Sequence, residues 1–243
     1  MLVLRSTLFS LGLLVLTPII AVLMALCLPF SQNLSYRVAR IWNLGMIAWL
    51  RITCGIRYRV VGAENIPSTP AIVMSKHQSS WETIFFVILF PRQVWVLKRE
   101  LLRLPFFGWG LAMLGAIAID RSAGQTALAQ VEQQGRDRLG RGLWVVVFPE
   151  GTRVAPGQVR PYGSGGAWLA THTQTAVLPV AHNAGELWPR NSFLKYPGTI
   201  TVSIGPVIHP DGMTPRELNE RVRDWIETEM QRIDGTAAER PHA

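Results

Sequence analysis

The most constraining feature of this sequence is a long uncharged run near its N-terminus. No charged residue occurs from Ser6 to Tyr36. Within that run, Leu8–Phe30 is long enough to cross a hydrocarbon core, which needs roughly 20 apolar residues. Pro18 interrupts the run, so a kinked spanning helix, a re-entrant segment and a hairpin anchor are all open. A signal peptide is disfavoured by the length of the run and the lack of a clear cleavage site. We expect residues 1–36 to be a membrane anchor or transmembrane segment.

The charges around this run are all positive. No aspartate or glutamate precedes Glu64, whereas the arginines there are Arg5, Arg37, Arg40, Arg51, Arg57 and Arg59. The whole chain carries a net charge of +8, although only 16% of its residues are charged. A basic, apolar N-terminal quarter suits an anionic membrane surface, and the arginines after the run favour a cytoplasmic catalytic domain. Nucleic acid is a weaker alternative, because no clustered basic helix or zinc or RNA-binding signature accompanies the charge.

A second apolar stretch, Ile41–Leu50, lies between two arginines. As a helix it would extend only ~15 Å, which is too short to span a membrane. Trp42 and Trp49 lie about two helical turns apart, and tryptophan prefers the level of the lipid headgroups. We expect residues 37–55 to form an interfacial helix, with a core helix of the soluble domain as the alternative.

From residue 56 onward, short β-rich runs alternate with helical stretches. The β-rich runs are Arg57–Val61, Ala71–Ser75, Val94–Leu97, Ala116–Asp120, Leu143–Phe148, Ala176–Ala181 and Thr199–Ile204. The helical stretches are Trp81–Leu89, Gln125–Arg138, Gly166–His172 and about Pro215 to Ile233, the last with Thr214 as its N-cap. This alternation predicts an α/β fold, with a mostly parallel sheet of about seven strands flanked by helices and preceded by N-terminal membrane-anchoring helices. We expect this domain to cover residues 56–234, followed by a disordered tail at 235–243.

A histidine and a carboxylate follow the second predicted strand. His77 comes directly after that strand, and Glu82 lies five residues later. Ligands of open α/β sheets gather beyond the carboxyl ends of the strands. There the imidazole could remove a hydroxyl proton while the carboxylate fixes its tautomer. The spacing alone is weak evidence, and a turn histidine with Ser79 or Ser80 capping the next helix is the alternative.

Two further segments end predicted strands in polar residues. Gly115–Arg121 ends with an acid and Arg121, which form either a surface ion pair or part of the crevice that holds His77. In Phe148–Arg153, the proline and the glycine force a tight turn that presents Glu150 and Arg153. Arginine suits bidentate contact with phosphate, and Glu150 can accept a hydrogen bond from a polyol. The predicted strand that contains Pro179 either belongs to the core or helps to form an acyl pocket.

Taken in order, these four segments resemble the glycerophospholipid acyltransferase family, specifically the 1-acyl-sn-glycerol-3-phosphate acyltransferases. The resemblance covers roughly residues 40–205, and the histidine-to-acid spacing together with Phe-Pro-Glu-Gly-Thr-Arg is highly specific. It implies that His77 is the general base and that Glu82 holds it, although aspartate is the commoner acid in that family. It also implies a set of residues that bind glycerol phosphate, namely Lys98, Arg121, Glu150, Gly151, Thr152 and Arg153. Pro179 would border the acyl pocket.

The resemblance implies acyl transfer from a thioester to the sn-2 hydroxyl of 1-acyl-sn-glycerol-3-phosphate, giving phosphatidic acid in phospholipid biosynthesis. The donor would be acyl-CoA or acyl carrier protein, with no further cofactor. We expect no metal, because the histidines and cysteines have no ligand spacing. We expect the enzyme at the inner (cytoplasmic) membrane. The alternatives are an acyltransferase for another lysolipid, such as a lyso-ornithine lipid or lysophospholipid, a hydrolase with Ser79 or Ser80 as nucleophile, and a non-catalytic membrane scaffold.

Overall fold

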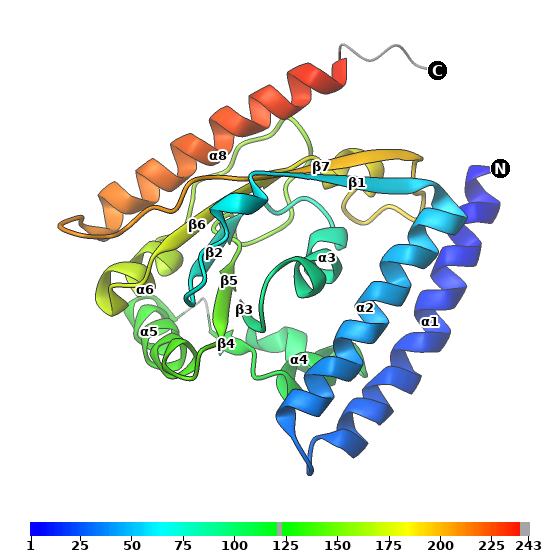
Figure 1. The fold of residues 1–243 in the computed structure, drawn as a ribbon, viewed down its shortest axis with the longest axis horizontal. Helices are drawn as coiled ribbons and strands as arrows, with labels where there is room; N and C mark the ends of the chain where they lie inside the picture. Colours follow the sequence, from blue (N-terminus) through cyan, green and yellow to red (C-terminus); the bar gives the residue numbers. More distant parts are fainter. Residues whose placement is uncertain (121–122, 239–243) are drawn as a thin grey trace.

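One sheet organises the protein in this computed structural model, which describes residues 1–120 and 123–238. In those residues, the sheet has seven strands in the order β1-β7-β6-β2-β5-β3-β4 (Figure 1). Neighbours are parallel except for the antiparallel pair β6–β7. The bounds are β1 Ile56–Val61, β2 Ile72–Ser75, β3 Gln93–Lys98, β4 Ile117–Ile119, β5 Trp144–Val147, β6 Val177–His182 and β7 Gly198–Ile204. Each predicted strand is present, so the predicted α/β class and mostly parallel sheet are confirmed.

The sheet separates two hydrophobic cores. In β5, Trp144 and Val146 join one core, while Val145 and Val147 join the other. Side chains alternate between the faces of a strand, so a strand covered on both sides is apolar at every position. This explains the continuous apolar run that the sequence shows at β5.

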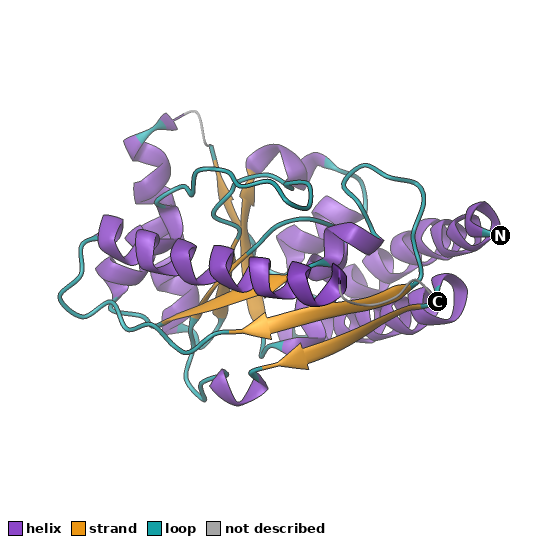
Figure 2. Cartoon of the chain, turned by 90° about the horizontal axis from the view of Figure 1, so that it is seen from above, coloured by secondary structure: helices purple, strands orange, loops and turns teal. Residues whose placement is uncertain are grey.

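Helices cover both faces of the sheet (Figure 2). One core contains side chains of α2 (Gln32–Cys54) and α3 (Trp81–Leu89), and the other contains side chains of α5 (Gln125–Gly140), α6 (Gly165–Thr173) and α8 (Pro215–Ala238). The smaller elements are η1 Ala63–Asn65, η2 Arg99–Arg103, α4 Phe107–Met113 and α7 Ala184–Leu187, which the sequence analysis did not predict. They are short, and periodicity needs a longer window to be visible.

The last helix, α8, begins as predicted. Thr214 caps it, since its Oγ1 accepts a hydrogen bond from the Glu217 N–H at 3.3 Å and Glu217 Oε2 accepts one from the Thr214 N–H at 2.8 Å. The helix ends at Ala238, beyond the boundary expected at residue 235. The remainder of the predicted tail, residues 239–243, lies outside the described residues.

Two long helices stand beside the sheet as an antiparallel pair, α1 (Leu2–Cys27) and α2 (Figure 1). The second helix is present over most of the range expected for it, 37–55, but α2 begins five residues earlier, at Gln32. The polar residues at its start hid its true length. Trp42 and Trp49 are half-buried, and the Trp49 Nε1–H donates to the carbonyl of Leu8 at 3.2 Å.

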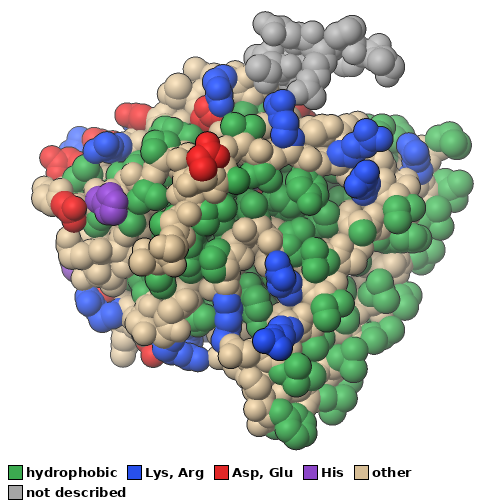
Figure 3. Space-filling view, in the orientation of Figure 1, with side chains coloured by type: hydrophobic (Ala, Val, Ile, Leu, Met, Phe, Trp, Pro, Cys, Tyr) green, Lys and Arg blue, Asp and Glu red, His purple; other side chains and the backbone are tan. Residues whose placement is uncertain are grey.

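The α1–α2 pair lies along the α/β part of the molecule and contacts it at both ends. At one end, Ser6 Oγ accepts a hydrogen bond from the Lys195 N–H at 3.0 Å, and Phe9 packs edge-to-face on Trp188. At the other end, the side-chain amide of Gln32 donates to the carbonyl of Met113 at 3.2 Å. In the described residues, α1 is the one helix long and apolar enough to cross a membrane. Its outer side exposes a broad hydrophobic surface (Figure 3).

Candidate active site

His77 and Glu82 meet at the start of α3. The ring Nδ1 of His77 lies 2.8 Å from Glu82 Oε1. The same oxygen accepts hydrogen bonds from the backbone N–H groups of Gln78 at 2.9 Å and Ser79 at 2.8 Å. Because a carboxylate only accepts, the neutral imidazole carries its proton on Nδ1. Nε2 is then the nitrogen that can take a proton from a substrate.

The surroundings of Glu82 favour its charged form. Burial by itself raises the pKa of this carboxyl, but nearby His182 and the hydrogen bonds from His77 and Ser79 more than offset burial. The pKa of Glu82 therefore lies below its ordinary value. A buried negative charge beside His77 stabilises an imidazolium cation when one forms.

The Phe148–Arg153 segment reaches His77 because β2 and β5 are adjacent parallel strands. Their carboxyl ends lie at the same edge of the sheet, so the loops that follow them touch. The Val154 N–H donates to the carbonyl of His77 at 2.7 Å. The Phe148 ring stacks on the imidazole, with centroids 4.0 Å apart and an interplanar angle of 13°. The base is thus fixed through its ring and through its backbone.

Glu150 has a different place from the predicted one. Its side chain is fully buried and does not line the cavity beside His77. Oε1 lies 2.7 Å from Lys76 Nζ, and Oε2 accepts a hydrogen bond from the His77 N–H at 2.8 Å. The prediction that Glu150 contacts a substrate polyol is therefore corrected. Its carboxylate turns inward because a buried lysine and a backbone N–H need an acceptor.

The other predicted phosphate-binding residues lie around the cavity. Arg153 lines it and donates to Ser80 Oγ at 2.8 Å, and Gly151 and Thr152 line it beside Arg153. Lys98, which is exposed at the end of β3, contributes from the next strand. Arg121 lies outside the described residues. Within the described chain, the structure thus brings Lys98 and Arg153 to the cavity that also contains His77.

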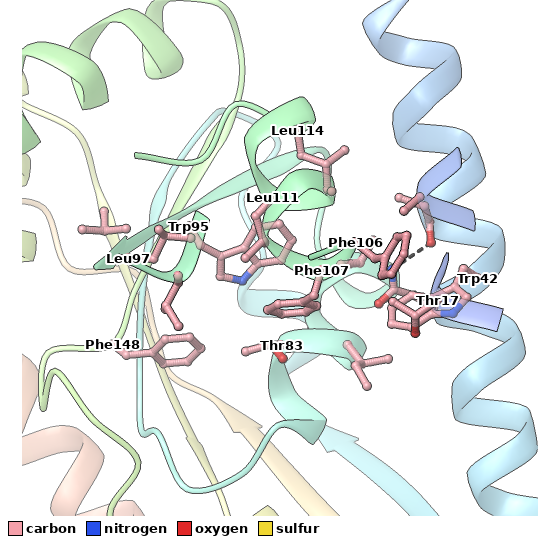
Figure 4. A pocket seen from close by; sticks show the side chains of 18 of the residues that line it. Thr17, Trp42, Thr83, Trp95, Leu97, Phe106, Phe107, Leu111, Leu114 and Phe148 are labelled. Carbon is pink, nitrogen blue, oxygen red and sulfur yellow. Dashed lines mark hydrogen bonds between the residues drawn. The ribbon is translucent and has the colours of Figure 1, made fainter. Parts of the chain in front are cut away.

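The cavity has a volume of about 340 Å³ and is mostly apolar beyond His77 (Figure 4). Its polar end is formed by the loops after β2 and β5. Its walls come from α1, α2, α3, β3, η2 and α4, and they include Thr17, Trp42, Ile84, Trp95, Leu101 and Leu111. The sequence analysis did not find these residues, because they come from six elements that only the tertiary structure assembles.

Pro179 does not belong to this cavity. It lies buried in β6, and its carbonyl accepts a hydrogen bond from the Gly205 N–H at 2.9 Å. In the sheet, β2 separates β6 from β5 and β3, whose ends border the cavity. The expectation that Pro179 borders the acyl pocket is therefore corrected in favour of the alternative, a core strand.

The two serines after His77 have structural partners. Ser79 Oγ accepts a hydrogen bond from the Trp81 N–H at 3.2 Å, and Ser80 Oγ accepts from Arg153. His77 is part of the described cavity lining, but neither serine is. A serine nucleophile consequently has no support in this arrangement.

Sequence reasoning also missed His182, which lies behind the site. It is fully buried, its Nε2–H donates to the carbonyl of Lys76 at 2.9 Å, and the same nitrogen lies 3.9 Å from Glu82 Oε1. Burial lowers the pKa of His182, although Glu82 acts in the opposite direction. No local pattern marks this residue, because Lys76 and Glu82 lie far away in the sequence.

Comparisons with known proteins agree with this geometry. The model of a family described as Acyltransferase matches residues 57–183. The chain is 48% identical over 209 residues to the 1-acyl-sn-glycerol-3-phosphate acyltransferase of Pseudomonas aeruginosa, covering 85% of this chain and 81% of that relative. It is 30% identical over 194 residues to the human 1-acyl-sn-glycerol-3-phosphate acyltransferase alpha, covering 77% of this chain and 69% of the human protein.

A solved structure shows the same fold. The crystal structure of the 1-acyl-sn-glycerophosphate (LPA) acyltransferase from Thermotoga maritima superposes with a TM-score of 0.82 at 21% identity. The match covers 100% of this chain and 98% of the Thermotoga chain. The matched family region contains both the His77–Glu82 pair and the Phe148–Arg153 segment. This chain belongs to the acyltransferase family.

Proposed function

We propose that this acyltransferase moves a fatty acyl group from a thioester to the sn-2 hydroxyl of 1-acyl-sn-glycerol-3-phosphate, giving phosphatidic acid. The observation that supports this proposal most strongly is the hydrogen-bonded His77–Glu82 pair at the polar end of a mostly apolar cavity. A phosphate-bearing lipid with a long chain matches both ends of such a cavity. The names of the relatives at 48% and 30% identity support the same substrate.

In this mechanism His77 acts as the general base. Nε2 takes the proton of the sn-2 hydroxyl as that oxygen attacks the thioester carbonyl. The resulting imidazolium is stabilised by the buried carboxylate of Glu82 through Nδ1–H. The tetrahedral intermediate then collapses, the carbon–sulfur bond breaks, and the leaving thiolate takes the proton back from His77.

The cations at the polar end would hold the acceptor. Arg153 and Lys98 line the cavity near His77 and are suited to a phosphate group. We propose Arg121 as a third phosphate-binding residue, and Gly151 and Thr152 as further contacts. Binding the phosphate at a fixed place brings the free hydroxyl to His77, which removes much of the entropic barrier.

The apolar part of the cavity would hold an acyl chain. Its walls are contributed largely by helices whose other sides expose apolar residues, including Leu14, Leu26 and Trp109. A thioester donor already carries an activated acyl group, so the reaction requires no metal or other cofactor. Acyl-CoA and acyl carrier protein are both suitable donors, and each leaves as a thiol.

The α1–α2 pair would bind the membrane surface. Both ends of the pair contact the α/β part, so we propose that it lies in one leaflet along the protein and does not cross the bilayer. Exposed Arg37 and Arg40 on α2 would contact anionic headgroups. The catalytic domain would then face the cytoplasm at the inner membrane.

A direct assay tests the proposal. Purified protein is incubated with lysophosphatidate, a lysophospholipid or a lyso-ornithine lipid, each with acyl-CoA and with acyl carrier protein, and the products are identified by mass. We expect phosphatidate with at least one donor, because Arg153 and Lys98 favour a phosphate monoester. Faster acylation of another lysolipid would reject the proposed acceptor while leaving the acyl-transfer mechanism intact.

A further inference from the structure

Lys76 is a buried charge that the proposed mechanism does not use. It directly precedes His77 and is among the largest fully buried side chains. Nζ lies 2.7 Å from Glu150 Oε1 and 2.9 Å from Glu227 Oε1, and it donates to the carbonyl of Gln158 at 3.3 Å. A lysine is found in such a place only when it is well paired. One of its two carboxylates comes from the far C-terminal helix.

Glu227 lies on the side of α8 that faces the rest of the protein, and its side chain is only 17% exposed. Oε1 accepts hydrogen bonds from Lys76 Nζ at 2.9 Å and from the Tyr162 hydroxyl at 2.8 Å. These partners belong to two different loops.

The first loop carries the base. Glu227 pairs with Lys76, Lys76 pairs with Glu150, and Glu150 Oε2 accepts a hydrogen bond from the His77 N–H at 2.8 Å. The chain of contacts therefore runs from α8 to the backbone of His77. Burial raises the pKa of Glu150, and contact with Lys76 offsets part of that effect, so the ion pair helps to keep Glu150 charged.

The second loop carries Arg153. It is closed at its base by a hydrogen bond from the Gly163 N–H to the carbonyl of Pro149 at 2.8 Å. At its far side the Tyr162 hydroxyl binds Glu227, and the carbonyl of Tyr162 accepts from the Asn219 side chain on α8 at 3.2 Å. The helix thus holds this loop from behind, on the side away from the cavity.

We propose that Glu227 is a positioning residue for the reaction, holding the His77 loop through Lys76 and the Arg153 loop through Tyr162. The roles of these two loops rest on the proposed function. A single carboxylate on a rigid helix would thereby set the distance between His77 and Arg153. Displacement of either side chain by about 1 Å can lower the rate roughly 10²-fold.

Two substitutions distinguish the contact of Glu227 with Lys76, which we call the Lys76 branch, from its contact with Tyr162. Glu227→Gln keeps the shape and an acceptor oxygen but removes the charge that pairs with Lys76, so both loops should shift. We expect kcat to fall by ~10-fold or more and KM for lysophosphatidate to rise. Tyr162→Phe removes one hydroxyl and no charge. It should raise that KM a few-fold while kcat changes by less than about twofold, because the Lys76 branch remains.

Glu220→Gln is the matched control on the same helix, since Glu220 is 47% exposed and pairs with Arg216 at the surface. It should leave both constants unchanged. A purely structural role for Glu227 would lower the amount of active enzyme without changing KM in either variant. Equal kinetics for Glu227→Gln and Glu220→Gln would also overturn the proposal.

Hydrogen–deuterium exchange gives a readout that does not depend on the substrate. Glu227→Gln should accelerate exchange in peptides covering 76–80 and 150–163, with α5 unchanged as the internal reference. Tyr162→Phe should accelerate it only in 150–163. Unchanged exchange in both loops would refute the positioning role. If the wild-type enzyme does not acylate lysophosphatidate, the proposed function fails, while the exchange result still decides the role of Glu227.

Discussion

The two ends of the cavity are built in different ways. At the polar end, the ring and the backbone N–H of His77 donate hydrogen bonds, its carbonyl accepts one, and Phe148 stacks on its ring. At the apolar end, the walls are side chains of packed helices and of β3 that are held by van der Waals packing (Figure 4). Acyl transfer needs atoms placed to a fraction of an ångström, whereas a flexible hydrocarbon chain needs only volume. Substitutions at the polar end should therefore change the rate, and those at the apolar end should change the choice of substrate.

The largest effect is expected for the base. His77→Ala should lower turnover by at least ~10²-fold, because no other group would take the hydroxyl proton. Turnover is measured on protein whose folding is checked by thermal unfolding. The exposed histidine His209 gives a matched variant, His209→Ala, which should keep normal turnover. Near-normal turnover of His77→Ala would show that His77 is not the base and that the polar end of the cavity does not carry the chemistry.

The carboxylate that holds the base should have the next largest effect. Glu82→Gln keeps the shape but removes the charge that stabilises the imidazolium, so turnover should fall roughly 10²-fold with little change in either KM. Glu82→Asp keeps the charge with a shorter reach and should retain much more activity. The order of the two variants decides the matter. If Gln equals or exceeds Asp, Glu82 serves mainly the start of α3.

Arg153 tests whether the polar end binds phosphate. Arg153→Ala removes charge-assisted hydrogen bonds, so KM for lysophosphatidate should rise by ~10-fold or more while KM for the acyl donor stays nearly constant. Steady-state kinetics with each substrate varied in turn measure both constants. Arg57→Ala is a suitable control and should leave both constants unchanged, because exposed Arg57 lies on the edge strand β1 and does not line the cavity. An equal rise in both constants would mean that Arg153 shapes the fold instead.

At the apolar end, a smaller effect on selectivity is expected. Gly110 lies on α4 and lines the cavity, and a Cβ atom added there would meet only Met24 within 4 Å. Gly110→Leu should fill space and lower kcat/KM for long acyl chains several-fold relative to short ones, at about 0.8 kcal/mol per excluded methylene. Ala112→Leu, on the exposed side of α4, should leave the chain-length profile unchanged. An unchanged profile in both variants would show that the chain binds elsewhere.

The smallest effect concerns stability behind the polar end. Burial lowers the pKa of His182 below its ordinary value of 6.5, so the folded state favours the neutral ring. Stability from this group is complete above the unfolded pKa, and it declines as pH falls from about 6.5 toward the folded value. His182→Gln should flatten the pH dependence of the denaturation midpoint in that window. An identical slope in wild type and variant would mean that other groups titrate there.

Much of the architecture follows from local sequence. The β-rich runs, the amphipathic α8 with its Thr214 cap and the segments at the ends of β2 and β5 are visible as periodicity and turn chemistry. The five-residue spacing places Glu82 in the first turn of α3, where it returns to His77. These features depend on residues close in the chain, so the sequence alone determines them.

Other features depended on tertiary structure. The start of α2 was hidden because polar residues there interrupt the apolar pattern, and two of them, Ser35 and Tyr36, are buried only because the helix packs against its neighbours. The place of Pro179 depended on strand order, which put β6 away from the cavity. A linear pattern states which side chains share a face, but it does not state which elements will be neighbours.

The buried charged residues show most clearly which features the sequence determines and which the tertiary structure decides. The sequence marks Glu150 as a residue of a tight turn, but its direction was set by Lys76, which needs a buried partner. Lys76 in turn meets Glu227, 151 residues further along the chain. Hydrophobic periodicity is local and survives in the sequence. The pairing of buried charges arises only when distant elements pack together and exclude water, which makes an unpaired charge costly.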